Sequence, residues 1–325
     1  MRLYKQIILP VSMGLALAVT SFAGRAVAQE YPSKRITVVV GFAAGGFTDS
    51  VARIVSEHIG KSLGQAVIVE NRGGAASNIA ARAVASAPAD GYTILASTTA
   101  LTINATLYKK IDYSILKDFI PVGVAVRAPE QFSVNPSRPR TLKEFLALAK
   151  TKKLTYGSAG VGSGSYLTWF SFFKNAAKAK VNHVPFKGGA PAMRAAIGGQ
   201  VDGLAATASG SVVAQVKEGK LACLAVAAAK RYKNLPDCPT LTESGFNVPE
   251  ASSWVGFWVP AKTPASVVAK LNKAINSIAD DKKAAASLTR NGELTGFSVK
   301  QTADFVESEV KTWGERVKAA GAQVE

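Results

Sequence analysis

Thr37-Val-Val-Val-Gly-Phe-Ala-Ala-Gly-Gly-Phe-Thr-Asp49 predicts a strand, a glycine turn and the start of a helix. The run 37–40 is β-branched, as in a strand buried on both faces. Gly45 and Gly46 cannot sustain that strand, and they permit positive φ angles and the close approach of a ligand. Such a turn directs unpaired backbone N–H groups and the positive end of a helix dipole at one point, which favours binding of an anion.

The residues after this turn have the spacing of an amphipathic helix. Thr48 or Asp49 can cap its start. Its apolar residues follow the pattern i, i+3, i+4, i+8: Val51, Ile54, Val55 and Ile59. The turn is not a nucleotide loop, because it lacks the lysine of a P-loop and the glycine spacing of a dinucleotide turn. A tight turn that binds no ligand is the alternative interpretation.

The first 28 residues have the pattern of a secretory signal peptide. Arg2 and Lys5 give a charged start, the apolar run 7–19 follows, and Ala26-Val-Ala28 resembles a cleavage site. The run is short for a membrane span. We therefore expect export to the periplasm, with cleavage after Ala28.

The charge and the metal-ligand content of the chain narrow the classes of partner. The 325 residues include 39 Lys and Arg against 22 Asp and Glu, a formal net charge of +17. These basic residues are scattered, without an arginine-rich arm or a basic stripe, so we expect no nucleic-acid partner and an attraction for small anions. The two histidines and two cysteines stand at no metal-ligand spacing, so we expect no metal. No cofactor loop is recognised either.

The two cysteines allow two interpretations. Cys223 and Cys238 are 15 residues apart, and an oxidising compartment permits a disulfide between them. Cys223 also lies in an apolar run typical of a buried strand, where a free thiol is common. The sequence leaves both possibilities open.

A unit of strand, glycine- or serine-rich loop and helix occurs six times along the chain. The six loops follow Phe42, Glu70, Ala96, Gly157, Phe186 and Thr207. This alternation predicts parallel sheets covered by helices, with the loops gathered at the carboxyl ends of the strands. An extended segment that breaks at Pro129 separates the first three units from the last three. We therefore predict two lobes that face a common cleft, formed by 29–128 plus 253–325 and by 129–252.

Several polar and aromatic residues have a structural interpretation that we prefer to a functional one. Trp169, Phe170 and Phe173 follow Tyr166 at helical spacing, which is typical of a core stripe, although Tyr166 itself stands beside a loop and can face a ligand. We expect Asp49 to satisfy first-turn N–H groups rather than to bind a ligand. Of the two histidines, we expect His183 to be packed and His58 to lie on the surface.

With these motifs in place, the chain resembles the extracytoplasmic solute receptors of tripartite tricarboxylate transporters, also called the Bug family. The landmarks extend over most of the chain. They are Tyr31-Pro-Ser-Lys-Arg-Ile-Thr, Gly45-Gly-x-Thr-Asp49, Val69-Glu-Asn-Arg-Gly-Gly, Asp90-Gly-Tyr-Thr, Tyr156-Gly-Ser-Ala-Gly, His183-Val-Pro-Phe-Lys-Gly, Gly199-Gln-Val-Asp, Leu235-Pro-Asp and Ser253-Trp.

The resemblance implies an α/β, two-lobed periplasmic-binding-protein fold of the type II-like kind, each lobe a mostly parallel sheet flanked by helices. It implies a receptor that closes on a small carboxylate and presents it to the membrane permease subunits of the transporter. With the first loop, it implicates these ligand-binding residues: Gly46, Phe47, Thr48, Asp49, Ser77, Asn78, Ser97, Thr98, Ser158, Ala159, Ser163, Tyr166, Lys187, Gly188, Gly189 and Thr207. We expect mainly backbone N–H and hydroxyl donors, with Lys187 assisting electrostatically.

The chain departs from many relatives at positions that bear on the ligand. It has Ala43 and Ala44 in place of two prolines, and Phe47 in place of a small residue. It has Tyr166 where many relatives have His, and Thr207 where many have Asp. An aromatic ring and the lack of an acid at 207 suit an aromatic or apolar carboxylate better than an amino acid. A dicarboxylate is the other expected ligand.

Two other functions remain as alternatives. The same liganded cleft could serve a signalling system as a sensor. A periplasmic hydrolase is the weaker alternative, because Gly162-Ser-Gly-Ser is not a nucleophile elbow and neither histidine stands where a catalytic base is expected. No paired acid and base carboxylates stand out in the loops. We therefore expect a protein without enzymatic activity.

Overall fold

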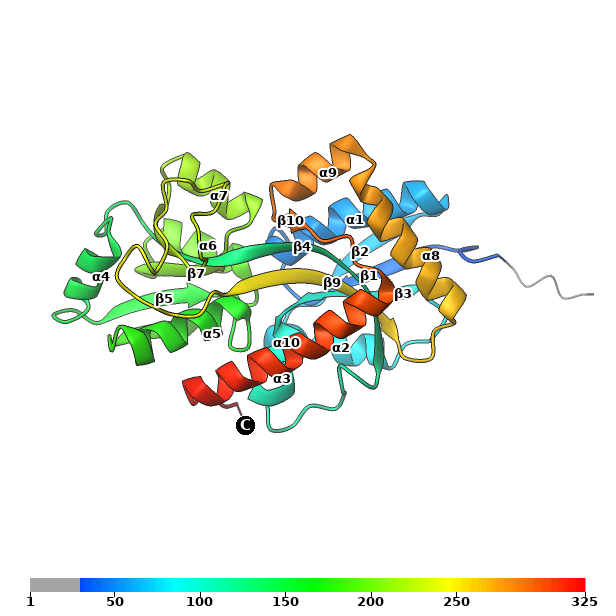
Figure 1. Ribbon diagram of the computed structural model, residues 1–325, viewed down its shortest axis with the longest axis horizontal. Helices are drawn as coiled ribbons and strands as arrows, with labels where there is room; N and C mark the ends of the chain where they lie inside the picture. Colours follow the sequence, from blue (N-terminus) through cyan, green and yellow to red (C-terminus); the bar gives the residue numbers. More distant parts are fainter. Residues whose placement is uncertain (1–29, 325) are drawn as a thin grey trace, which may run out of the picture.

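The computed structural model describes residues 30–324. The expected signal peptide, 1–28, lies outside the described residues. Within 30–324, no helix is both long and apolar enough to cross a membrane. Figure 1 shows an elongated molecule of two lobes, with β4 and β9 running side by side between them.

The first lobe begins with three of the predicted units, and each strand is followed by a helix. In chain order its elements are β1 (Ile36–Val40), α1 (Phe47–Leu63), β2 (Val67–Asn71), the 3-10 turn η1 (Ala75–Ser77), α2 (Asn78–Ala85), β3 (Thr93–Thr98) and α3 (Ala100–Leu107). The long strand β4 (Phe119–Val134) then leads into the second lobe.

The second lobe contains the other three units and is followed by a return to the first. Its elements are α4 (Leu142–Leu148), β5 (Leu154–Ser158), α5 (Gly164–Ser171), the π-helical turn η2 (Phe172–Ala176), β6 (Val181–Pro185), α6 (Gly189–Ile197), β7 (Gly203–Thr207), α7 (Gly210–Lys217) and β8 (Ala222–Val226). The chain returns through β9 (Ser252–Pro260), α8 (Ala265–Asn276), η3 (Ser277–Ala279), α9 (Lys282–Thr289), β10 (Glu293–Leu294) and α10 (Val299–Ala320).

The strands form one curled sheet in the order β2-β1-β3-β9-β4-β7-β5-β6, with β8 and β10 also paired to β4. The strands of the predicted units are parallel within each lobe: β1 with β2 and β3, and β5 with β6 and β7. Between the lobes β4 and β9 pair with each other in antiparallel fashion. The six units are confirmed, and their loops lie at the carboxyl ends of parallel strands.

The predicted break at Pro129 is wrong, because β4 runs through it without interruption. Pro129 has no N–H to donate, but its neighbour Glu130 donates to Ala251 of the return segment, and the Pro129 carbonyl accepts from Ala208. Proline is tolerated here because the strand changes partners at this point: Phe119–Pro129 pairs with β9, and 130–134 pairs with β7. The chain therefore passes between the lobes inside a strand. The residue boundaries proposed for the lobes stay a prediction.

Each lobe has its own apolar core. In the first lobe, buried residues of α1 and α8 pack on β1 and β9, and the predicted stripe residues Val51, Val55 and Ile59 are fully buried. In the second lobe an aromatic cluster surrounds Phe132 and includes Trp169 and Phe173, which confirms them as core residues. Burial of such large rings is the main source of stability for a lobe of this size.

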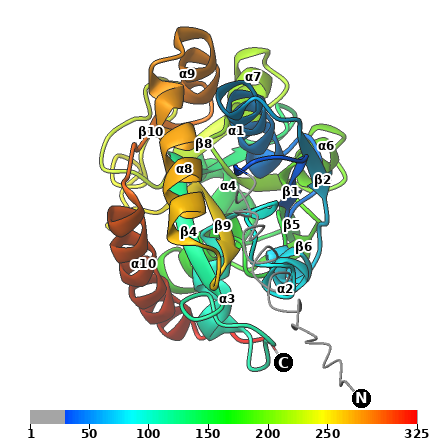
Figure 2. The same ribbon diagram turned by 90° about the vertical axis from the view of Figure 1, so that its right-hand side faces the viewer.

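Helix α10 packs on both cores. Val306 near its start joins a first-lobe cluster, whereas Trp313 and Val317 join the aromatic core of the second lobe. Glu309 accepts from the indole N–H groups of Trp254 on β9 and Trp313, at 2.7 and 2.9 Å. Figure 2, viewed from the first-lobe end, shows α10 along one flank, opposite the edge strand β2.

The question about the cysteines is settled in favour of the disulfide. Cys223 on β8 is bonded to Cys238 in the irregular segment that leads back towards β9. Cys238 is 3% exposed and packs with Leu235 and Tyr232. The bond fastens the start of the return segment to the second lobe.

Candidate functional site

A cavity of about 40 Å³ lies between the lobes, at the loops that the six units bring together. Its first-lobe wall comes from the start of α1 and from the carboxyl end of β3: Gly46, Phe47, Thr48 and Thr98. A cavity of this volume holds only a few water molecules. Entry of a larger ligand therefore requires the two lobes to separate first.

The second-lobe wall comes from the starts of three helices. It includes Ser163 to Ser165 at α5, Gly189 at α6 and Ser209 and Ser211 at α7. With α1, four helix N-termini thus converge on one cavity. Each helix dipole presents its positive end, and the first N–H groups of a helix have no backbone partner inside it. At α5 and α7 a side chain already accepts from one of them, Ser163 from Tyr166 and Asn291 from Gly210, so α1 and α6 are the more open ends. The arrangement is suited to a negatively charged group.

The first loop is shaped differently from the sequence prediction. Gly45 has a φ of 79°, a left-handed angle that favours glycine. Gly46, with φ of −87°, does not need glycine for its angle, and it is the residue that precedes the helix. An added Cβ at Gly46 would lie 3.6 Å from the N atom of Ala190 and 3.7 Å from that of Gly189, across the gap to the other lobe. These are ordinary contact distances, so a single Cβ fits at this position, but a larger side chain would reach into the contact between the lobes.

Asp49 holds this loop in place. Its carboxylate accepts from the N–H of Gly45 (2.9 Å), from Arg53 (3.0 Å) and from the amide of Asn71 (2.9 Å). Burial by itself raises the pKa of Asp49, but these hydrogen bonds and the charge of Arg53 outweigh it and hold the pKa below its usual range. The predicted cap of first-turn N–H groups is wrong in detail, because α1 has no side-chain cap and the carboxylate reaches back to the loop.

We expect Asp49→Ala to weaken ligand binding about tenfold and to lower the free energy of unfolding by about 1–3 kcal/mol, because three donors lose their acceptor. Isothermal titration and urea unfolding measure the two effects. Asp304→Ala is the matched control, since it removes an exposed carboxylate paired with Lys300 on α10 and should change stability by less than about 1 kcal/mol. Equal effects of the two substitutions would contradict this role of Asp49.

Half of the predicted ligand-binding residues line the cavity. They are Gly46, Phe47, Thr48, Thr98, Ala159, Ser163, Gly189 and Thr207. Thr48 is 4% exposed, and its hydroxyl has no hydrogen-bond partner among residues 30–324, so it is free to donate to a ligand. Thr98 accepts from the N–H of Ala100 and still has its own proton to donate.

The other predicted residues lie behind this wall or beside it. They are Asp49, Ser77, Asn78, Ser97, Ser158, Tyr166, Lys187 and Gly188. Ser97 donates to Ser77 at 2.7 Å, and Asn78 accepts from Tyr113 at 2.6 Å and from Asn104 at 2.9 Å. These polar groups satisfy one another and stiffen the loops that follow β2 and β3. A direct role in binding stays a prediction for all eight.

Ser158 and Tyr166 share a partner in His183. The Ser158 hydroxyl lies 2.7 Å from His183 Nε2, and the Tyr166 ring packs 4.6 Å from the imidazole. Burial lowers the pKa of His183 to about 4, so the ring is neutral at neutral pH. His183 is packed as predicted, and the Tyr166 ring, stacked on Phe170, also faces the second-lobe core.

Lys187 lines a separate cavity of about 240 Å³ that shares only Phe42 and Ala159 with the first. Its carbonyl accepts from the N–H of Ala43 at 3.1 Å, a hydrogen bond that joins the loops after β1 and β6 across the cleft. An added Cβ at Gly188 would lie 3.0 Å from that same N atom. The two loops are therefore in direct contact.

Several residues at the cavity were missed by the sequence reasoning. Ser211 and Met193 lie in helices that were predicted, and Ser209 directly precedes one. No sequence motif indicates that these side chains point into the cavity. Ser253 appeared only as part of a family landmark. The most informative omission is Glu130, which is fully buried where β4 crosses between the lobes. Burial raises the pKa of Glu130 to about 7, against the lowering effect of hydrogen bonds from Ser253 and Thr207.

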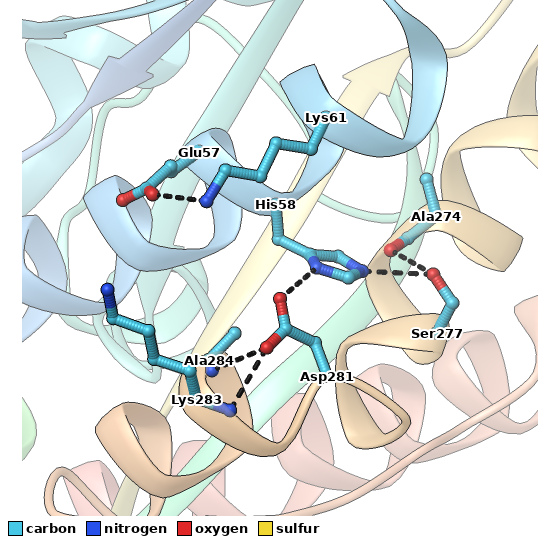
Figure 3. Close-up of polar contacts among 8 residues, drawn as sticks. All are labelled: Glu57, His58, Lys61, Ala274, Ser277, Asp281, Lys283 and Ala284. Carbon is cyan, nitrogen blue, oxygen red and sulfur yellow. Dashed lines mark hydrogen bonds and ion pairs between the residues drawn. The ribbon is translucent and has the colours of Figure 1, made fainter.

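A second polar cluster resembles a hydrolase triad at first sight. His58 Nε2 lies 3.0 Å from Ser277 Oγ, and Nδ1 lies 3.5 Å from Asp281 (Figure 3). Ser277 also donates to the carbonyl of Ala274, and Asp281 caps α9. The cluster thus ties α1 to η3 and α9. The expectation that His58 is a surface residue is wrong, since its side chain is only 10% exposed.

The sequence of this chain is similar to those of known receptor proteins. The family model described as the tripartite tricarboxylate transporter family receptor matches residues 51–322. A curated relative is the protein BugT of Bordetella pertussis, 30% identical over 320 residues that cover 96% of this chain and 97% of BugT.

Solved structures agree with the fold. The periplasmic binding protein BugD is 33% identical, with a TM-score of 0.86 over 91% of this chain and 100% of BugD. A Rhodopseudomonas palustris protein with adipate is 31% identical, with a TM-score of 0.85 over 90% of this chain and 100% of its own. MatC of the same organism, with bound malate, is 33% identical, with a TM-score of 0.82 over 88% of this chain and 100% of its own. A Polaromonas solute-binding protein without ligand is 28% identical over 89% of this chain and 99% of its own, with a TM-score of 0.62.

Proposed function

The chain belongs to the tripartite tricarboxylate transporter receptor family, the Bug receptors, and on this premise we propose that it captures a small organic carboxylate in the cavity between its lobes. The observation that carries the proposal is the convergence of four helix N-termini, α1, α5, α6 and α7, on that cavity. Fixed backbone dipoles bind an anion without burying a second side-chain charge. The relatives with adipate and malate are in keeping with this chemistry.

We assign the ligand's carboxylate to the donors at the start of α1 and α6. Thr48 and Thr98 supply hydroxyl donors from the first lobe, and the first N–H groups of α6 face them from the second. Phe47 and Met193 give the rest of the cavity an apolar wall. An aromatic carboxylate or a dicarboxylate with an apolar middle suits this combination. The eight predicted residues that do not line the cavity hold the loops in position: Asp49, Ser77, Asn78, Ser97, Ser158, Tyr166, Lys187 and Gly188.

A thermal-shift screen tests this function. The panel contains mono-, di- and tricarboxylates, aromatic ones included, and a ligand present at a hundred times its Kd stabilises the folded state by about 2.7 kcal/mol. We expect at least one carboxylate to raise the melting temperature. Mass spectrometry after long incubation should return the same molecule. A panel without any shift would refute the receptor, and an altered product beyond stoichiometric yield would favour the hydrolase alternative.

The lobes close on the ligand, in this proposal, by movement about the β4 and β9 crossing. This chain is more similar in shape to the adipate- and malate-bound relatives than to the Polaromonas protein without ligand, at comparable sequence identity. The contact of Ala43 with Lys187 across the cleft also belongs to a closed arrangement. We propose the lobe ranges 29–128 plus 253–325 and 129–252 for the moving parts, with α10 in contact with both.

Solution scattering tests closure. The radius of gyration should fall when a carboxylate that passes the thermal-shift screen is added at saturation, because separated lobes are further apart than closed ones. A carboxylate that gives no thermal shift is the control and should leave the radius unchanged. An unchanged radius with a bound ligand would show that binding occurs without closure.

We further propose that the protein is exported, loses 1–28 after Ala28 and works in the periplasm. The relative BugD is a periplasmic binding protein, which supports the location. It delivers its ligand to the permease subunits of a tripartite tricarboxylate transporter and catalyses no reaction. A sensor for a signalling system is the alternative. Uptake of labelled ligand by cells that lack either the receptor or the permease separates the two, since a sensor is not required for uptake through an expressed permease.

A further inference from the structure

Glu130 occupies an unusual place for a carboxyl group. It lies within β4 at the crossing between the lobes and is fully buried. Within 30–324 no Lys or Arg is paired with it, and its recorded partners are hydroxyl groups. An unpaired buried carboxyl is costly, so such a group usually has a role other than stability.

The carboxyl lies directly behind one part of the cavity wall, formed by Ser253, Thr207 and Gly164, which we call the floor. Ser253 donates to Oε1 at 2.5 Å, and Thr207 lies 3.4 Å from both carboxyl oxygens. Ser253 and Thr207 both line the cavity, as does Gly164, whose added Cβ would lie 2.7 Å from Oε1. Two cavity hydroxyls from two different strands thus contact one buried carboxyl, and the lack of a side chain at Gly164 leaves room for it.

These contacts fix the direction of the floor hydroxyls. A hydroxyl has one proton and two lone pairs. Above pH 7 Glu130 is ionised and can only accept, so Ser253 gives it a proton, away from the cavity. The longer contacts from Thr207 orient its hydroxyl in the same direction, and lone pairs of both oxygens are then left for a ligand. Ser253 is also 2.8 Å from the Thr99 hydroxyl, which must then be the donor of that pair. The floor accepts hydrogen bonds, whereas the helix N-termini around it donate them.

We propose that Glu130 is a positioning residue that makes the receptor select carboxylates bearing a hydroxyl group, by turning the Ser253 and Thr207 hydroxyls into acceptors. The inference rests on the proposed function, since it names the ligand class of the same cavity. The ligand's carboxylate binds at the helix N-termini, and its hydroxyl donates to the floor. A plain carboxylate leaves the floor oxygens without a donor, which lowers affinity.

The test uses pairs of ligands that differ by one hydroxyl: malate with succinate, lactate with propionate, and mandelate with phenylacetate. Isothermal titration at about pH 8.5, where Glu130 is ionised, should give the hydroxylated member of a bound pair about tenfold or more higher affinity in the parent protein. Glu130→Leu removes the acceptor and should abolish or reverse the preference. Glu130→Gln keeps an oxygen that accepts from Ser253 and should retain the preference in weaker form.

Thr207→Val is a second variant of equal size that removes one floor hydroxyl and should also reduce the preference. A merely structural role would change the affinity of both members of a pair equally and leave their ratio unchanged, and this result in Glu130→Leu would overturn the inference. A parent that binds carboxylates without preference would also overturn it, while the proposed function would stand. If no member of any pair and no carboxylate of the screen binds, both fall together.

Discussion

Gly46→Val should abolish carboxylate binding while the protein still folds. The residue has an extended backbone that valine adopts without strain, so stability should fall by no more than about 1 kcal/mol from the loss of a favourable cap residue. The two γ-methyl groups would point from the Cβ position, already 3.6 Å from the N atom of Ala190, into the contact between the starts of α1 and α6. They block the donors and keep the lobes apart.

The expected loss of affinity is at least about a hundredfold, the value of one or two hydrogen bonds to a charged group. Titration calorimetry with a carboxylate from the screen measures it, and circular dichroism checks the fold. Gly46→Ala is the matched control, because its Cβ meets neighbours only at ordinary contact distances and should cost little affinity. If the valine variant binds as tightly as the parent, the turn after β1 is not the binding site.

Glu130→Gln should stabilise the protein increasingly as the pH rises. The folded state raises the pKa of Glu130 from 4.5 to about 7, so the folded protein keeps a proton that the unfolded chain releases. Below pH 4.5 both states are protonated and there is no cost. Between pH 4.5 and 7 the parent loses about 3 kcal/mol of stability to this group, and the loss then remains constant. Glutamine cannot ionise and escapes this cost.

Chemical unfolding at pH 4.5 and pH 8 measures the effect. The difference in free energy of unfolding between variant and parent should grow by about 3 kcal/mol over that range. Glu307→Gln, which removes an exposed carboxyl from α10, controls for the change in total charge and should show little growth. A constant difference between Glu130→Gln and parent would mean that Glu130 stays ionised in the folded protein throughout.

The sequence predicted what depends on local pattern. The run 37–40 is a strand, the six loops lie where strands meet helices, and Trp169 and Phe173 are buried, because periodicity and glycine placement report directly on these features. The alternation of the six units also predicted two lobes, and the family landmarks added the periplasmic-binding-protein type of fold. Eight of the predicted site residues line the cavity because their loops belong to those units.

What the sequence did not reveal depends on contacts between distant segments. Proline usually interrupts a strand, and only the change of partners from β9 to β7 makes Pro129 acceptable. Glu130 looks like any polar residue in a strand until Ser253 and Thr207 are brought against it from 123 and 77 residues away. Asp49 was expected to cap a helix. Its hydrogen bonds from Arg53 and Asn71 direct the carboxylate elsewhere, and residue spacing alone does not indicate them.

The paired strands β4 and β9 have a mechanical consequence. Two single loops would let the lobes swing freely, but these strands cross as a hydrogen-bonded ribbon along Phe119–Pro129 and Ser252–Pro260. A two-stranded ribbon deforms mainly by twisting along its length, so movement of the lobes works against the elasticity of the ribbon rather than about a free hinge. In the proposed closure the ligand must therefore supply the energy that twists this ribbon, and an untwisting ribbon favours reopening once the ligand is released.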